Sequence, residues 1–448
     1  MAPGAATTCL HTSCEPCPAR RLAEGASRVR RLIKLIPFLF FRLGLFAVWR
    51  LVPRPIRQMV VRQVVPALPS RGQPLARAVE PVFVVGFLRS TTSLGWNARQ
   101  LSETARSAGL KVFGFDVAGA FAAEHLPATE HSDPPTAETA AGAATLLICV
   151  NPDQFRYAAA FLPPASFKNK YVIGWCVWEL ERIPHQWVEP LGILDEMWVP
   201  SEFVRRAFVD SGVSLPCRIV PPQLDLPAPA APDRKRFGIE QDAFAVFFAF
   251  SLRSGVVRKN PMAAVRAFLK AFPHEREVRL VFKISDVDIE ASAWTAFRAE
   301  VGDDPRFVFI TDFLSDHDML SLFASIDVAL STHRAEGYGM IPALAMLSGR
   351  AVIATGWSAV LDFMTSENSI LLPYKLVPVE DVDERYVIEG ASWAEVDEDA
   401  AALALQRLHA DPVYREQLAR AGKDSIEAYL AQHRNDLVDY LRSWRREP

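Results

Sequence analysis

The chain has 448 residues, of which 50% are hydrophobic and 23% charged, and its formal net charge is −3. This length exceeds one compact core and predicts two domains plus extensions, while the composition excludes a disordered or fibrous protein. Its six cysteines are too sparse for a disulfide scaffold, which predicts a reducing, cytoplasmic setting.

Basic residues are concentrated at the N-terminus, where residues 1–66 contain eleven Lys and Arg against two acids. The apolar run LIPFLFFRLGLFAVWRLVP is interrupted by Pro37, Arg42 and Arg50, so it falls short of a membrane-spanning helix, and no signal-peptide cleavage site follows it. Two interpretations stay open. Residues 20–66 bind an anionic membrane surface, which would place the protein at the inner face of the cell membrane, or they pack on the protein's own domain.

Strand-like and helix-like segments alternate after a proline-containing linker at 66–74. Strands separated by helices predict a parallel sheet that is covered on both faces. A helix is expected over 93–109, and short apolar strands are expected at Pro81–Phe87, 110–116, Ala144–Asp153, 170–180 and 195–201.

A second alternation follows the proline-rich linker at 220–233. Two such doubly wound halves predict an interdomain cleft, lined by the carboxyl ends of strands, as the place where a ligand binds. In this half we expect strands at 243–252, 278–285, 307–314, 327–332 and 351–356, and helices at 260–272, 318–326 and 340–349.

The stretch STHRAEGYGMIPALAMLSGRAVIATG places Gly337 and Gly339 between a strand and a helix. Glycine lets the backbone approach a ligand closely, and a helix start offers unpaired N–H groups and the positive end of the helix dipole. We interpret this turn as a phosphate site. A turn whose glycines serve backbone geometry alone remains the alternative.

Three cations follow directly after the expected strand at 243–252. The segment SLRSGVVRKNP supplies Arg253, Arg258 and Lys259, which could neutralise a diphosphate in the same domain as the glycine turn. Solvated loop charges are the alternative.

The first domain offers weaker candidates for the cleft. Gly86 and Gly95 fall in the first strand-to-helix turn, and Glu179 follows a strand on the expected acceptor side. His185 and His333 are possible sugar contacts or structural residues. Core packing is the preferred interpretation for the four tryptophans Trp175, Trp178, Trp187 and Trp198.

Two groups resemble incomplete metal sites. Cys9, His11, Cys14 and Cys17 contain one Cys-x-x-Cys without a second pair, and Asp286 and Asp288 are interpreted as surface acids. We expect no bound metal.

These motifs, together with YVIGWCVWELERIPHQWVEPLGILDEMWVPSEFV and LLPYKLVPV, resemble the retaining family-4 glycosyltransferases over Pro81 to about Gly422. The resemblance implies an α/β protein of the GT-B fold, with two Rossmann-like doubly wound domains facing a cleft. We place the acceptor-side domain at 77–224 and the nucleotide-sugar domain at 225–422. An N-terminal extension at 1–76 precedes them, and a C-terminal helix at 423–448 would cross back to the first domain.

The resemblance also implies roles for individual residues. Arg253 and Lys259 correspond to the pair that binds the donor diphosphate, and Glu336 corresponds to the acid that faces the donor sugar. The acid that usually holds the ribose hydroxyls stands eight residues further on, where this sequence has Leu344. Ala359 and Val360 likewise replace an expected glycine and polar residue. The remaining donor contacts would be Arg258, Gly337, Tyr338, Gly339 and Met340.

The activity implied is transfer of a hexose-type sugar, with retention, from a nucleotide-diphosphate donor to a glycan or glycolipid, as in polysaccharide biosynthesis. In this family the leaving phosphate is thought to take the acceptor proton, so neither a metal nor a cofactor is expected, and no nucleic-acid partner is expected either. Because Leu344 removes the ribose acid, a non-catalytic binding or scaffold protein of the same fold is the alternative function.

Overall fold

The computed structural model describes residues 68–90, 92–117, 142, 144–162, 166–224, 230–381, 386 and 388–445. The basic segment at 20–66 and the cysteines at its N-terminal side lie outside these ranges. No helix within the described ranges is long and apolar enough to cross a membrane.

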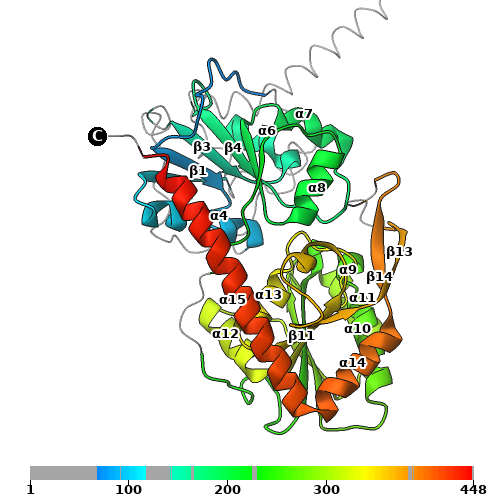
Figure 1. The fold of residues 1–448 in the computed structure, drawn as a ribbon. Coiled ribbons are helices and arrows are strands. Elements are labelled where there is room, and N and C mark those ends of the chain that lie inside the picture. The colour runs from blue at the N-terminus through cyan, green and yellow to red at the C-terminus, as the bar shows by residue number, and fades with distance from the viewer. Residues whose placement is uncertain are drawn as a thin grey trace, which may run out of the picture.

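Two six-stranded parallel sheets form the two domains (Figure 1). The first has the order β2-β1-β3-β4-β5-β6, and the second has the order β12-β11-β10-β7-β8-β9. Both orders place the first strand of the domain inside the sheet, with later strands added on either side, as the doubly wound α/β fold requires. The expected fold class is therefore confirmed.

The first sheet is built from short, continuously apolar strands, and every residue of β1 (Val82–Gly86) and β3 (Thr145–Cys149) is buried. Such runs are typical of strands covered on both faces. The other strands are β2 (Val112–Asp116), β4 (Tyr171–Trp175), β5 (Glu196–Val199) and β6 (Cys217–Ile219), and the α-helices are α4 (Ser93–Ser107), α6 (Pro152–Phe161), α7 (Val188–Leu191) and α8 (Glu202–Asp210).

The second sheet follows the same plan with longer central strands. Its core contains a dense aromatic cluster in which Phe248, Phe282 and Phe297 pack edge to face. Its strands are β7 (Phe244–Ser251), β8 (Val278–Ser285), β9 (Phe307–Ile310), β10 (Val328–Ser331), β11 (Ala351–Thr355) and β12 (Ile370–Leu372). Its α-helices are α9 (Val256–Lys259), α10 (Pro261–Ala271), α11 (Ala291–Val301), α12 (Asp316–Ser325), α13 (Met340–Leu347) and α14 (Glu398–Ala410).

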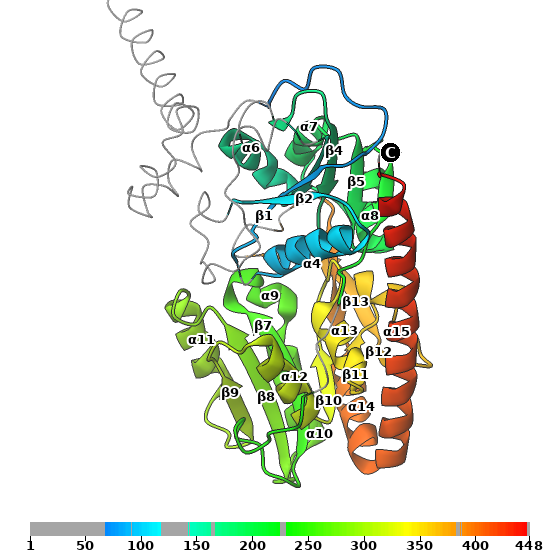
Figure 2. The same cartoon turned by 90° about the vertical axis from the view of Figure 1, so that its left-hand side faces the viewer.

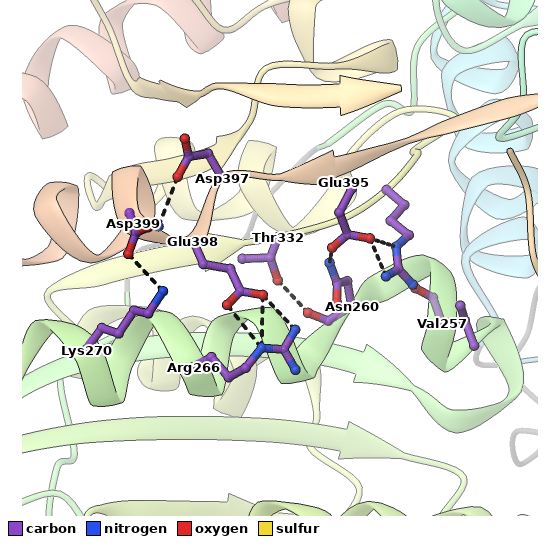
Figure 3. Close-up of polar contacts among 10 residues, drawn as sticks. Val257, Asn260, Arg266, Lys270, Thr332, Glu395, Asp397, Glu398 and Asp399 are labelled. Atoms are coloured by element: carbon purple, nitrogen blue, oxygen red, sulfur yellow. Dashed lines mark hydrogen bonds and ion pairs between the residues drawn. The ribbon is translucent and has the colours of Figure 1, made fainter. Parts of the chain in front are cut away.

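An antiparallel hairpin of β13 (Tyr374–Pro378) and β14 (Ser392–Val396) was not predicted from the sequence. Figure 3 shows how polar contacts attach it to the second domain: Glu395 of β14 accepts a hydrogen bond from Asn260, and the following helix α14 pairs Glu398 with Arg266 and Asp399 with Lys270. The connection between the two strands contributes Tyr386 and Ala391 to the core of the first domain, and β14 itself contributes Trp393. The hairpin therefore joins the two domains.

The helix α15 (Pro412–Arg442) makes a second connection. It lies along the second domain and ends against the first, as both views of the chain show (Figures 1 and 2). Leu437, Leu441 and Trp444 are buried in the core of the first domain. Its polar anchor is Glu196 of β5, a buried acid that accepts hydrogen bonds from Tyr440 Oη at 2.6 Å and Trp198 Nε1 at 2.8 Å.

Replacing Glu196 by alanine is expected to lower the free energy of unfolding by about 3 kcal/mol, because it leaves the buried Trp198 indole N–H and the part-buried Tyr440 hydroxyl without their acceptor. Chemical denaturation followed by tryptophan fluorescence measures this loss. Glu103→Ala removes an exposed carboxylate whose ion pair with Arg106 lies within the same helix, and it should change stability by less than about 0.5 kcal/mol. Equal effects of the two variants would contradict the anchoring role.

Candidate active site

The loops that follow β7 and β10 lie against each other at the carboxyl ends of their strands. The Arg334 N–H donates to the carbonyl of Arg258 at 2.8 Å, and the Thr332 hydroxyl donates to the carbonyl of Asn260 at 2.7 Å. Asn260 adopts a left-handed conformation, with φ 54°, which ends α9 and lets α10 start at the next residue. The two loops are therefore joined by hydrogen bonds into one unit that carries both sets of predicted donor residues.

A buried charge cluster occupies this unit. Lys259 Nζ donates to Glu336 Oε1, and Arg258 Nη1 lies 3.3 Å from Glu336 Oε2. Burial alone would raise the pKa of the Glu336 carboxyl, but the charges of Lys259 and Arg258 outweigh it and lower that pKa to about 2. Glu336 is thus ionised at neutral pH. In the described part of the chain, its carboxylate is the only one that contacts both Arg258 and Lys259.

The backbone of Glu336 is hydrogen-bonded to the turn that follows β11. The Ser358 hydroxyl accepts a hydrogen bond from the Glu336 N–H at 2.9 Å, and the Ala359 N–H donates to the Glu336 carbonyl at 3.3 Å. Ala359 and Val360 are both fully buried in this turn. Small and apolar side chains at these two positions therefore fit the packing of this chain.

The glycine turn lies at the contact between the domains. Gly337 packs so closely on the first domain that a Cβ atom there would lie 2.6 Å from the Trp178 carbonyl oxygen. The Ser201 hydroxyl of the first domain donates to the Gly337 carbonyl at 2.9 Å. Gly339 has φ +92° and forms the N-cap of α13, a conformation that favours glycine. Both glycines are thus required by geometry that this chain itself imposes.

The comparisons with known proteins address the same region. Residues 253–385 match the family model described as glycosyl transferases group 1. This match lies within the second domain, which is therefore similar to these glycosyltransferases, and the chain as a whole has the GT-B fold.

Solved structures support the fold over most of the chain. HepE of Anabaena, crystallised with UDP and glucose, matches with a TM-score of 0.58 at 13% identity, over 81% of this chain and 99% of that chain. Sucrose-phosphate synthase of Thermosynechococcus elongatus matches with a TM-score of 0.57 at 15% identity, over 81% of this chain and 98% of that chain. No curated protein sequence matches the chain.

The donor residues expected from the glycosyltransferase resemblance fall into two groups in the structure. Lys259, Glu336 and Arg258 are brought together, whereas Arg253 lies exposed in the 3-10 helix Leu252–Ser254, one turn before α9. The ring of Tyr338 is buried 5.4 Å from that of Phe363, so this tyrosine serves the core of its own domain.

The position of the missing ribose acid lies on α13. Leu344 and Met340 are half-buried and pack against an apolar cluster of the second domain that includes Phe247 and Val352. Leucine at this place is therefore well accommodated by packing, and the substitution of an apolar for an acidic residue needs no rearrangement of the fold.

The candidates from the first domain are divided. Glu179 approaches the charge cluster, with Oε1 3.7 Å from Arg258 Nη2, while His185 is exposed in the 3-10 helix His185–Trp187. Gly86 and Gly95 serve local packing: a Cβ at Gly86 would meet that of Ala98 at 2.9 Å, and one at Gly95 would lie 2.3 Å from the carbonyl oxygen of Phe87.

His333 is a buried structural residue. Its Nδ1 lies 2.9 Å from the Ser331 hydroxyl and its Nε2 lies 3.2 Å from the Trp357 carbonyl, so both ring nitrogens are engaged. Burial lowers its pKa to about 4, which keeps the ring neutral at pH 7. The structural alternative therefore holds for His333. All four tryptophans assigned to packing are buried as well.

Sequence reasoning missed Tyr386 and the pair formed by Arg334 with Glu395. Tyr386 is 2% exposed, with its ring 5.3 Å from that of Trp178 in the other domain. Nothing in the local sequence marks this tyrosine, since its partners are distant along the chain. Within the described ranges, no three His, Cys, Asp or Glu side chains are grouped as a metal ion would require.

Proposed function

We propose that the chain is a retaining hexosyltransferase that moves a sugar from a nucleoside-diphosphate donor to a glycan or glycolipid. The observation that carries this proposal is the part-buried Lys259–Glu336 pair at the carboxyl ends of β7 and β10, in the domain that matches the family model. A desolvated ammonium beside an ionised carboxylate offers one group for a phosphate and one for sugar hydroxyls.

In this proposal residues 225–422 bind the donor and residues 77–224 bind the acceptor. Lys259 exchanges part of its contact with Glu336 for phosphate oxygens, assisted by Arg253 and by the N-terminus of α13. Glu336 then accepts hydrogen bonds from sugar hydroxyls while Arg258 stays its partner. Because the chain itself supplies the positive charge, we propose transfer without a metal. Glu179, His185 and the turn around Gly86 and Gly95 would line the acceptor side.

A glycolipid acceptor agrees with attachment of residues 20–66 to an anionic membrane surface. Cosedimentation with vesicles of phosphatidylcholine, with and without phosphatidylglycerol, checks this attachment. Binding that is independent of the anionic lipid, or that survives deletion of residues 1–66, would contradict it.

The test of donor binding is calorimetric titration with UDP, GDP and ADP. UDP is the first choice because the similar HepE structure contains it. We expect one nucleotide to bind, and the Arg253→Ala, Lys259→Ala double variant to lose that binding. If none of the three binds, the non-catalytic scaffold of the same fold becomes the better conclusion, since Leu344 leaves the ribose without its usual acceptor.

Replacing Leu344 by glutamate separates the two functions. In a working donor site the new carboxylate would accept ribose hydroxyls, and each charge-assisted hydrogen bond contributes about 1.5 kcal/mol or more. The nucleotide should therefore bind about 10-fold more tightly, with sugar transfer kept or raised. The matched control is Leu403→Glu, which adds the same charge at an exposed position of α14. No tightening by Leu344→Glu would favour the scaffold.

A further inference from the structure

Arg258 is buried, and both terminal nitrogens of its guanidinium are engaged within the protein. Its side chain is 3% exposed, and its two terminal nitrogens donate to the carbonyls of Ala335 at 2.7 Å and Ser254 at 2.9 Å. The Tyr386 ring lies 5.6 Å away as a cation–π partner. A guanidinium held in this way acts within the protein, so the role of donor ligand expected for Arg258 passes to Lys259.

The two acids that Arg258 contacts come from different domains. Glu336 lies in the loop after β10 of the second sheet, and Glu179 lies in the loop after β4 of the first. Arginine suits this place because its planar fork carries five donors in fixed directions, so that it can reach two carboxylates and two carbonyls together. Arg258 is therefore a charged bridge between the domains.

We propose that Glu179 is a positioning residue for the donor sugar, acting through Arg258 on Glu336. This inference rests on the proposed function. In the bridge Glu179 shares Arg258 with Glu336, so Glu336 keeps its other oxygen on Lys259 and a defined orientation. Recognition of the sugar on the donor-side domain thus depends on an acid of the acceptor-side domain, and the site is complete only when the domains meet.

The charge balance of the cluster gives the physical reason. Arg258 and Lys259 are matched by Glu179 and Glu336, so the four buried or half-buried groups are neutral together. Without the charge of Glu179, one positive charge is uncompensated, and Arg258 competes with Lys259 for the Glu336 carboxylate. Glu336 is then drawn toward Arg258 and away from its position beside Lys259.

Glu181 is a matched control in the same loop. Its Oε1 accepts the Ser392 N–H of β14 at 2.7 Å, so it contacts the hairpin at the same domain interface. Replacing Glu179 or Glu181 by glutamine keeps the size of the side chain and removes one negative charge. Only the first substitution changes the charge cluster, which separates positioning from a general loosening of the interface.

The experiment is calorimetric titration of wild type, Glu179→Gln and Glu181→Gln with UDP and with UDP-glucose. We expect Glu179→Gln to weaken binding of UDP-glucose about 10-fold and to leave binding of UDP within about 2-fold, since the nucleotide does not need Glu336. Glu181→Gln should leave both affinities near wild type. Equal loss of both ligands in Glu179→Gln, or no loss of either, would overturn the proposal.

A second measurement does not require a donor. If wild type binds neither UDP nor UDP-glucose, this donor assignment fails, but the bridge can still be tested by a double-variant cycle of Glu179→Gln and Glu336→Gln in chemical denaturation. Because the two acids share Arg258, the denaturation midpoints should shift non-additively. Additive shifts would show that the acids act independently, and the positioning role would be rejected.

Discussion

Replacing Lys259 by alanine is expected to lower kcat/KM for sugar transfer by about three orders of magnitude while the protein stays folded. Removing one preorganised donor that stabilises charge in a transition state typically costs a factor of about 100 to 1,000, and the Lys259 ammonium is a full charge at 17% exposure. The fold should tolerate the change because Glu336 keeps Arg258 as a charged partner and the Ser358 hydroxyl continues to hold its backbone.

Steady-state kinetics with the donor found by titration measures this loss. Lys270→Ala is the control on the neighbouring helix α10, where the lysine is half exposed and pairs with Asp399. It should leave kcat/KM within about 2-fold of wild type, since an exposed ion pair contributes little. A Lys259→Ala enzyme with turnover close to wild type would move the site of charge stabilisation away from this cluster.

The fold could be predicted from the sequence because it follows from hydrophobic patterns within short segments of the chain. Continuous apolar runs such as Val82–Gly86 alternate with amphipathic helices, and this pattern admits few arrangements other than a covered parallel sheet. The hairpin of β13 and β14 was not predicted because its sequence pattern is partly polar and the residues that it packs against lie in other segments of the chain. Tyr386 and Trp393 are buried in the core of the first domain, whose residues are distant along the chain.

The sequence named candidate residues for the site, but it did not predict the contacts among them. The order of motifs along the chain identified Lys259 and Glu336, but no spacing predicts that they pair with each other. Arg258 was expected to bind the donor because it is a cation beside a strand end. Its burial, and its contact with Glu179 about eighty residues earlier in the chain, follow from how the two domains meet. Sequence patterns predict local structure along the chain, but they do not predict which side chains meet across an interface between domains.

Gly337 illustrates the same point and is the place of the second large effect. Its glycine was expected for close approach to a ligand, whereas the structure shows close approach to the other domain. A Cβ atom at this position would lie 2.5 Å from Val177 Cγ2 and 2.6 Å from the Trp178 carbonyl oxygen. The methyl group of Gly337→Ala must therefore displace the loop that carries Glu179, or Glu336 itself. We expect a loss of about 1 to 3 kcal/mol in stability, as for other overpacked sites, and at least a 100-fold loss of kcat/KM.

A companion variant shows whether the clash itself is the cause. Val177→Ala removes the contact with the Val177 side chain and leaves the contact with the Trp178 carbonyl. Combined with Gly337→Ala, it should restore part of the lost activity, because we attribute the loss to the clash and little of it to the backbone conformation of residue 337. Gly192→Ala, at the end of α7, introduces the same methyl group with its nearest neighbour at 3.3 Å and should be nearly silent. If Gly337→Ala turns over sugar at the wild-type rate, the two domains do not need this contact during transfer. If Gly337→Ala loses activity and the Gly337→Ala, Val177→Ala double variant regains part of it, the distance between the glycine turn and the acceptor-side loop is part of the active geometry.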